Sequence, residues 1–82
     1  MHYIYILKSQ TDLSQEYVGQ TADLKLRLRK HNSGQVAHTS KFMPWKIIWY
    51  CAFEEKAKAL AFEKYLKSAS GRAFSKKRFT TS

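Results

Sequence analysis

The sequence predicts an α+β domain in which helices flank a three-stranded antiparallel sheet. Three observations carry this prediction. Three short segments are rich in aromatic and β-branched residues, other segments have the end signals of helices, and no repeat or linker interrupts the 82 residues. A chain of this length has material for only one sizeable hydrophobic core. We therefore expect residues 1–82 to form a single domain.

Strands are expected at about residues 3–8, 16–20 and 46–53. Residues 3–7 are continuously apolar, which is typical of a strand that is covered on both faces. A polar stretch long enough to reverse the chain joins the first two strands, so we expect them to pair as an antiparallel hairpin. This pairing would place Tyr5 and Tyr17 in one sheet.

The segment at about residues 22–33 carries two conflicting signals. Its leucines alternate with basic residues, which is the period of a strand. Thr21 as an N-cap, Asp23 in the first turn and Gly34 after the end are instead signals of a helix. The segment also contains no β-branched residue, and because such residues are unfavourable in helices, their absence favours a helix. We expect a helix here, although the period disagrees.

Two more helices are expected, at about residues 55–69 and 72–79. Acidic residues open the first, basic residues lie near its end and Gly71 follows, as the helix dipole and C-terminal capping favour. Its apolar face is a stripe at helical spacing, formed by Ala59, Phe62 and Leu66. The second of these helices is strongly basic.

The net charge of +9 is the most pronounced feature of the composition. Residues 41–82 carry ten basic and three acidic side chains, whereas residues 1–40 carry five and three. Such an excess indicates a polyanionic partner, with nucleic acid first and an anionic membrane surface second. The ordinary alternative is a solvated basic surface without a dedicated ligand.

The composition also excludes several classes of protein. The apolar run near the N-terminus, residues 3–7, is five residues long, too short for a signal-peptide core, and every uncharged apolar run is far below the roughly 20 that a transmembrane helix needs. Cys51 is the only cysteine, which excludes an internal disulfide bond and a thiolate zinc site. A single cysteine also fits a reducing cytoplasm, where we expect the protein.

Hydrolysis of a phosphodiester sets clear requirements for a candidate site. The attacking water must lose a proton, the phosphate charge must be neutralised, and the leaving oxygen must be stabilised. A divalent cation on one carboxylate, with a guanidinium beside it, supplies the last two. Histidine can take the proton, as can tyrosine if nearby positive charge lowers its pKa. The residues available for these roles are Tyr5, Tyr17, Arg27, His31 and Glu63.

Each of these residues also has a purely structural interpretation. Tyrosines in strands are usually core residues, and an arginine on a basic helix is usually solvated. Glu63 is four residues from Lys67, so an ion pair along one helix explains it without any metal. Arg27 and His31 are likewise four residues apart, which puts both on one face of the expected helix.

Two tripeptides and one expected helix help to decide between the catalytic and the structural interpretation of these residues. YIY at residues 3–5 and YVG at residues 17–19 are separated by eleven residues, and DLxxRLxxHN follows at residues 23–32. With Glu63 in a helix after a third strand, the arrangement resembles the GIY-YIG nuclease superfamily, above all its small stand-alone bacterial members. The resemblance covers about residues 3–79 and implies a catalytic domain like that of the excision-repair nucleases.

The resemblance implies a role for each candidate. Tyr5 would be the general base or would position the nucleophilic water, and Tyr17 would line the site and contact phosphate or water. Gly19 would let backbone and substrate approach closely. Arg27 would neutralise the scissile phosphate, and His31 would support proton transfer.

Glu63 would be the only protein ligand of one Mg²⁺ or Mn²⁺ ion, which waters and phosphate oxygens would complete. The expected activity is hydrolysis of DNA phosphodiester bonds, structure-selective in DNA repair or recombination, with RNA as a second candidate substrate. An exposed Trp45 or Trp49 could stack on bases, although Trp49 in a strand suits the core better. Six basic residues are expected to grip the phosphate backbone: Lys64, Lys67, Arg72, Lys76, Lys77 and Arg78.

Two other functions stay open. Many active members of the superfamily carry an asparagine after the metal-binding glutamate, whereas the only asparagine of this chain, Asn32, precedes Glu63. A non-catalytic or weakly active nucleic-acid-binding module of the same fold is therefore the main alternative. A small basic RNA- or ribosome-associated protein would also explain the charge, but not the five candidate residues together.

Overall fold

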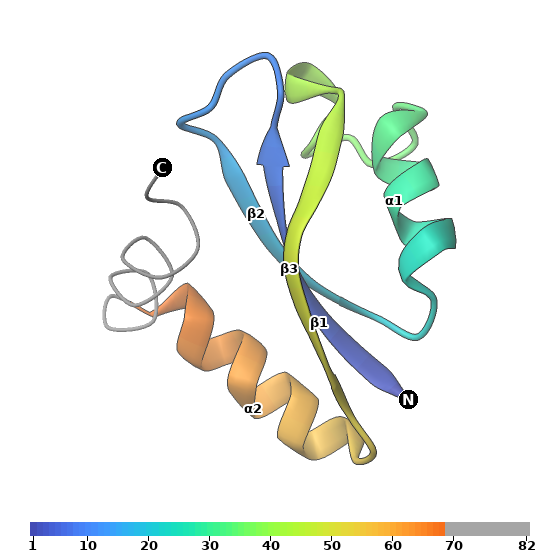
Figure 1. Cartoon of the computed structure of the whole chain (residues 1–82), viewed down its shortest axis with the longest axis vertical. Helices are drawn as coiled ribbons and strands as arrows, with labels where there is room; N and C mark the ends of the chain where they lie inside the picture. Colours follow the sequence, from blue (N-terminus) through green and yellow to red (C-terminus); the bar gives the residue numbers. More distant parts are fainter. Residues whose placement is uncertain (69–82) are drawn as a thin grey trace.

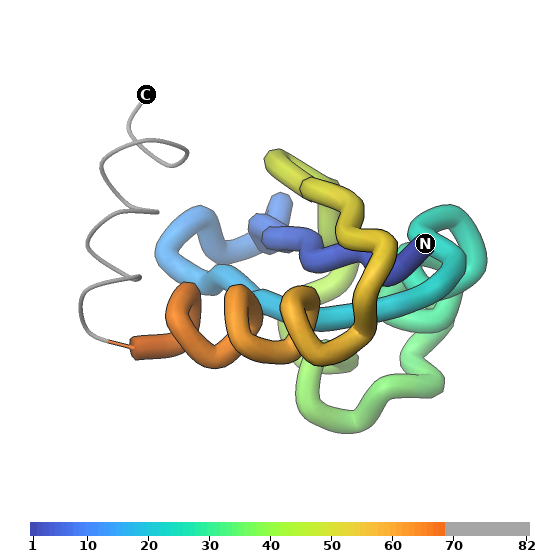
Figure 2. The backbone as a smooth tube through the Cα atoms, turned by 90° about the horizontal axis from the view of Figure 1, so that it is seen from below, coloured from blue at the N-terminus to red at the C-terminus, as the bar shows by residue number. Residues whose placement is uncertain are grey.

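The computed structural model describes residues 1–68 of the chain. The elements follow the order β1 (His2–Ser9), β2 (Glu16–Thr21), α1 (Leu24–Asn32), the 3₁₀ helix η1 (Ser40–Phe42), β3 (Trp45–Phe53) and α2 (Lys56–Lys67). The strands form one antiparallel sheet in the order β2-β1-β3. Helices α1 and α2 pack on opposite faces of this sheet (Figure 1, Figure 2). The predicted α+β fold class is confirmed.

Strand β1 is the centre of the fold, because it pairs with both other strands. Alternate side chains of a strand point to opposite faces of the sheet. Ile4 and Ile6 accordingly pack on the α2 face, whereas Tyr5 and Leu7 pack on the α1 face, and all four are buried. The continuous apolar run therefore reflects a strand that is covered on both sides, as predicted.

The strand boundaries differ from the predicted ones by one residue, and one of these differences matters. Trp45 opens β3 and is only 5% exposed, so the expectation of an exposed, base-stacking Trp45 is wrong. The indole N–H donates to the carbonyl of Thr39 at 2.8 Å, and the backbone N–H of Trp45 donates to Asn32 Oδ1 at 2.6 Å. These bonds tie the loop to the end of α1. Trp49 packs against Phe62 in the core, as its strand position favours.

Helix α1 shows why the leucine spacing was ambiguous. Leu24 and Leu28 pack against the sheet, whereas Leu26 between them is 42% exposed. The helix begins at Leu24 and not at residue 22, because Asp23 is the N-cap and accepts a hydrogen bond from the backbone N–H of Leu26 at 3.0 Å. Thr21, predicted as the cap, instead bonds to the backbone of Asp23 in the turn before it.

Helix α2 confirms the predicted apolar stripe. Ala59 and Leu66 are fully buried, and Phe62 packs against the same cluster. The helix begins at Lys56, one residue later than predicted, because Glu55 is the N-cap residue. Its last residue is Lys67, and Ser68 is the C-cap residue. No helix within residues 1–68 is both long enough and apolar enough to cross a membrane.

Part of the prediction lies outside the described residues. This part includes Gly71 and the whole of the helix expected at residues 72–79. It also includes four of the six basic residues that were expected to grip the phosphate backbone: Arg72, Lys76, Lys77 and Arg78.

Candidate functional site

The candidate residues of β1, β2 and α1 meet on the face of the sheet that α1 covers. In the β1–β2 ladder Tyr5 lies opposite Gly19, and Leu7 lies opposite Tyr17. Because residues opposite each other share a face, Tyr17 projects to the same side as Tyr5. The centroids of the two tyrosine rings are 6.3 Å apart.

Gly19 provides the space in which these rings lie. A Cβ atom at Gly19 would lie 2.5 Å from Cζ of Tyr5 and 2.9 Å from Cε1 of Tyr17, and would also overlap the Tyr5 hydroxyl. Any other residue would therefore push the rings out of place. Glycine permits this close approach because it has no side chain. In the free protein the room is taken by the tyrosines, and the approach of substrate to Gly19 stays a prediction.

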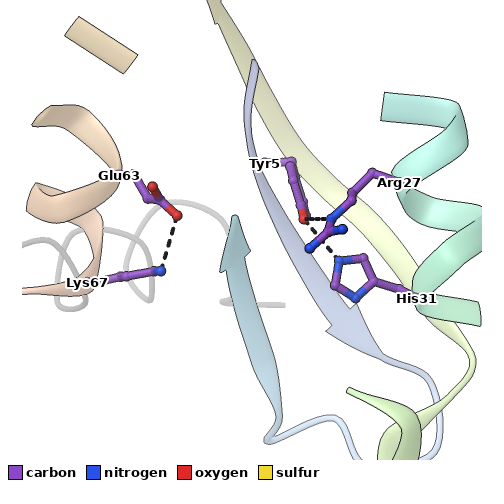
Figure 3. Close-up of polar contacts among 5 residues, drawn as sticks. All are labelled: Tyr5, Arg27, His31, Glu63 and Lys67. Atoms are coloured by element: carbon purple, nitrogen blue, oxygen red, sulfur yellow. Dashed lines mark hydrogen bonds and ion pairs between the residues drawn. The ribbon is translucent and has the colours of Figure 1, made fainter. Parts of the chain in front are cut away.

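The Tyr5 hydroxyl is the centre of a buried polar cluster. It lies 2.9 Å from Nε2 of His31 and accepts a longer hydrogen bond, 3.4 Å, from Nε–H of Arg27 (Figure 3). The Tyr5 side chain is 2% exposed, and His31 is fully buried. Arg27 and His31 thus reach one oxygen from the same face of α1, as their spacing predicts.

Two further residues contact this cluster that the sequence did not single out. The other ring nitrogen of His31, Nδ1, lies 2.8 Å from Oγ1 of the buried Thr39. The Tyr17 ring packs on the His31 ring, with centroids 4.9 Å apart, and also contacts the ring of exposed His38 at 5.9 Å. Thr39 and His38 belong to a polar loop without period or motif, so no local signal points to them.

Burial determines the protonation states in the cluster. Burial and, after it, the charge of Arg27 lower the pKa of His31 to about 4, so its imidazole is neutral at physiological pH. Burial also raises the pKa of Tyr5 and outweighs the lowering effect of the hydrogen bond from Arg27. Tyr5 is therefore a neutral phenol in the free protein, and nearby positive charge does not by itself make it a base.

We expect the fold to lose stability as the pH falls from about 6.5 to about 4. The pKa of His31 is about 4 in the folded state against an ordinary 6.5, so the unfolded chain binds this proton more tightly. The contribution is fully present above pH 6.5, and its loss reaches about 3 kcal/mol once the pH is below the folded-state value. Urea unfolding at a series of pH values measures it.

A matched pair of variants assigns this loss to His31. His31→Gln cannot titrate and should show a much smaller fall in the free energy of unfolding over the same pH range. His38→Gln changes an exposed histidine of the neighbouring loop, and its free energy of unfolding should fall as much as that of the wild type. An equal fall in the wild type and His31→Gln would contradict the assignment.

Glu63 is not part of the Tyr5 cluster. It lies on α2, which covers the other face of the sheet, and its Oε2 forms an ion pair with Nζ of Lys67 at 3.1 Å (Figure 3). The structural interpretation of Glu63 as an i, i+4 partner of Lys67 is thus confirmed. The Glu63 carboxylate still contributes to the raised pKa of Tyr5, although it is the smallest contribution.

A metal ion at Glu63 would need ligands from outside the protein. Within residues 1–68 no group of three or more His, Cys, Asp or Glu side chains is arranged to hold a metal ion. A single carboxylate nevertheless suits Mg²⁺ or Mn²⁺, because such ions prefer oxygen and Mg²⁺ commonly keeps waters and binds substrate phosphates. The Glu63 side chain is 19% exposed, so its carboxylate is partly accessible. It could bind such an ion once the ion pair with Lys67 is broken.

Only two of the six predicted phosphate-gripping residues lie in the described part of the chain. Lys64 is exposed on α2, and Lys67, whose side chain is 53% exposed, is paired with Glu63. Neither contacts the Tyr5 cluster through a hydrogen bond within residues 1–68. Their contact with nucleic acid stays a prediction.

Comparison with known proteins shows which family this chain resembles. A family model of the GIY-YIG catalytic domain matches residues 1–78. A UPF0213 protein of Staphylococcus saprophyticus is 36% identical over 70 residues, which cover 84% of this chain and 83% of that protein. One of Clostridium perfringens is 37% identical over 68 residues, 82% of this chain and 71% of that protein. The solution NMR structure of a UPF0213 protein of Bacillus halodurans has 32% sequence identity and a TM-score of 0.55, covering 92% of this chain and 79% of that one.

Proposed function

Since the chain belongs to the GIY-YIG family, we propose that it is a divalent-metal-dependent endonuclease that hydrolyses DNA phosphodiester bonds. One observation supports this most. Arg27 and His31 converge on the hydroxyl of Tyr5, which joins a phosphate-binding cation and a proton acceptor at one oxygen. The net charge of +9 favours a nucleic acid as the polyanion.

Arg27 is the proposed binder of the scissile phosphate. It uses its Nε–H on Tyr5, and a guanidinium has four further N–H donors in a planar fork that suits two phosphate oxygens. The hydrogen bond to Tyr5 raises the pKa of Arg27 further, so its charge is permanent. A phosphate held here would lie next to the Tyr5 hydroxyl, with Tyr17 lining the same face.

Tyr5 and His31 carry the proton in this proposal. The bond from the water oxygen to phosphorus forms while the bond to the leaving oxygen breaks, and the leaving oxygen takes a proton from solvent. The water proton passes to the Tyr5 oxygen as the phenol proton passes to Nε2 of His31. Substrate aids this transfer, because a phosphate beside Arg27 offsets the positive charge that helps to lower the pKa of His31.

Glu63 is the proposed ligand of the metal ion. A bound Mg²⁺ or Mn²⁺ would neutralise charge on the phosphate and stabilise the leaving oxygen. We propose damaged, branched or unpaired DNA as the substrate class, in repair or recombination. Binding would rest on phosphate contacts and would weaken steeply with salt.

One observation favours a second function, a nucleic-acid-binding module without cleavage. Lys67 occupies the carboxylate that the metal would need, with its Nζ 3.1 Å from Oε2 of Glu63. In that case the protein would bind DNA with the same salt dependence but would cut none. The two functions differ in one measurable property, which is strand cleavage.

A plasmid-nicking assay with an Arg27→Ala variant tests the proposed function. The wild type should nick DNA with Mg²⁺ or Mn²⁺ and stop when the metal is chelated. Arg27→Ala should slow nicking by about 10²- to 10³-fold, the loss typical of one removed charge-stabilising donor. Arg29→Ala removes the same charge from an exposed position on the same helix and should leave nicking nearly unchanged. A wild type that cuts no duplex, branched or single-stranded DNA with either metal would overturn the proposal and leave the second function.

A further inference from the structure

A chain of hydrogen bonds leads from Trp45, through Thr39 and His31, to the Tyr5 hydroxyl. The indole N–H of Trp45 donates to the carbonyl of Thr39 at 2.8 Å, and Thr39 Oγ1 lies 2.8 Å from Nδ1 of His31. On the other side of the imidazole, Nε2 lies 2.9 Å from the Tyr5 hydroxyl, which also accepts from Arg27. The positions of the protons in this chain decide whether Tyr5 can pass its hydroxyl proton to His31.

The Thr39 end of the chain assigns the proton on Nδ1. A threonine hydroxyl has one proton to donate. The carbonyl of Val36, 3.3 Å away, can take this proton, and the Thr39 oxygen is then the acceptor on the side of His31. In that arrangement the His31 nitrogen that faces it carries a hydrogen.

The Tyr5 end of the chain leads to the same assignment. The Tyr5 oxygen accepts a hydrogen bond from Arg27, and its own proton needs an acceptor. Tyr5 is 2% exposed, and within the described residues the acceptor within hydrogen-bond distance is Nε2 of His31. A buried hydroxyl proton without a partner would destabilise the fold. Nε2 must therefore be the unprotonated nitrogen.

Thr39 is held in place before any substrate arrives. It is 1% exposed, its backbone N–H donates to the carbonyl of Val36 at 3.1 Å, and its carbonyl accepts from Trp45. We propose that Thr39 is a positioning residue that keeps His31 in the Nδ1–H tautomer, so that Nε2 can accept the proton of Tyr5. This inference rests on the proposed function and adds to it a residue that touches neither water nor phosphate.

Loss of the Thr39 hydroxyl should weaken the preference for the Nδ1–H tautomer. The tautomer of a histidine follows the hydrogen bond that its other nitrogen makes. Without the Thr39 oxygen, Nδ1–H is buried without an acceptor, so a larger share of His31 carries its proton on Nε2, which cannot take the proton of Tyr5.

Thr39→Val is the informative variant, because valine keeps the shape of the side chain and removes the hydroxyl. The ¹⁵N spectra of the imidazole at neutral pH should show Nδ1–H for His31 in the wild type and a larger share of Nε2–H in Thr39→Val. The cleavage rate of this variant should fall by about 10- to 100-fold in kcat with little change in KM, as for other residues that orient a functional histidine. Thr39→Ser retains the hydroxyl and should restore both the tautomer and the rate.

Thr11→Val is the matched control, because Thr11 is exposed and its hydroxyl donates to the carbonyl of Phe42, away from His31. It should change neither the tautomer nor the rate. An Nε2–H tautomer in the wild type would overturn the inference, even if Thr39→Val failed to fold. So would a Thr39→Val protein with the wild-type tautomer and rate. If the wild type cuts no DNA but its tautomer depends on Thr39, the proposed function fails while the positioning of His31 stands.

Discussion

Replacing Glu63 with glutamine is expected to abolish metal-dependent cleavage while salt-sensitive binding to DNA persists. Glutamine has nearly the shape of glutamate but no negative charge, so it holds a divalent ion poorly. A metal ion contributes several kcal/mol of charge stabilisation in the transition state, which predicts a loss of about 10³-fold or more. Nicking rates at saturating Mn²⁺ and fluorescence anisotropy with labelled DNA measure the two properties separately.

Two control variants make this result specific. Glu55→Gln changes an exposed carboxylate at the start of the same helix, paired with Lys58, and should cleave like the wild type. Lys67→Gln removes the ammonium group from Glu63 and should tighten Mn²⁺ binding. The Glu63–Lys67 pair is partly exposed, and exposed pairs contribute little stability, so the rate loss would not come from unfolding. A Glu63→Gln protein with the wild-type rate would show that Glu63 does not hold the metal.

The second large effect is expected from Tyr5→Phe. This change keeps the ring that packs over Gly19 and removes only the hydroxyl that Arg27 and His31 contact. Loss of a general base typically costs about 10²- to 10⁴-fold, so single-turnover cleavage should slow by this factor. DNA affinity should change little, because the guanidinium of Arg27 remains.

Tyr50→Phe is the matched control for this variant. Tyr50 lies directly opposite Tyr5 in the β1–β3 ladder and is 55% exposed, so loss of its hydroxyl should affect neither rate nor stability. Tyr5→Phe should also lower stability by about 1–3 kcal/mol, because it leaves buried polar atoms without their partner. If Tyr5→Phe cleaves at the wild-type rate while folded, the water proton goes to a group other than Tyr5.

Local signals were sufficient for the three strands and for helices α1 and α2, but not for the 3₁₀ helix η1. The apolar run of β1 and the stripe of α2 are properties of short segments, and both predictions are confirmed. The signals failed where partners are distant in the sequence. Trp45 was expected to be exposed, yet it is buried with Tyr5 and Leu7 and forms hydrogen bonds to Asn32 and Thr39. Such bonds depend on how the loop folds back on α1, which no periodicity encodes.

The sequence by itself determined the family and the shared helix face of Arg27 and His31. The two tripeptides fall on paired strands, and a spacing of four residues puts Arg27 and His31 on one side of a helix whatever surrounds it. The tertiary structure decided the chemical state of these residues. His31 and Tyr5 are 26 positions apart in the chain, and their burial together raises the pKa of Tyr5 and, with the charge of Arg27, lowers the pKa of His31. Protonation depends on solvent exclusion and neighbouring charge, and both arise only when the sheet and α1 pack together.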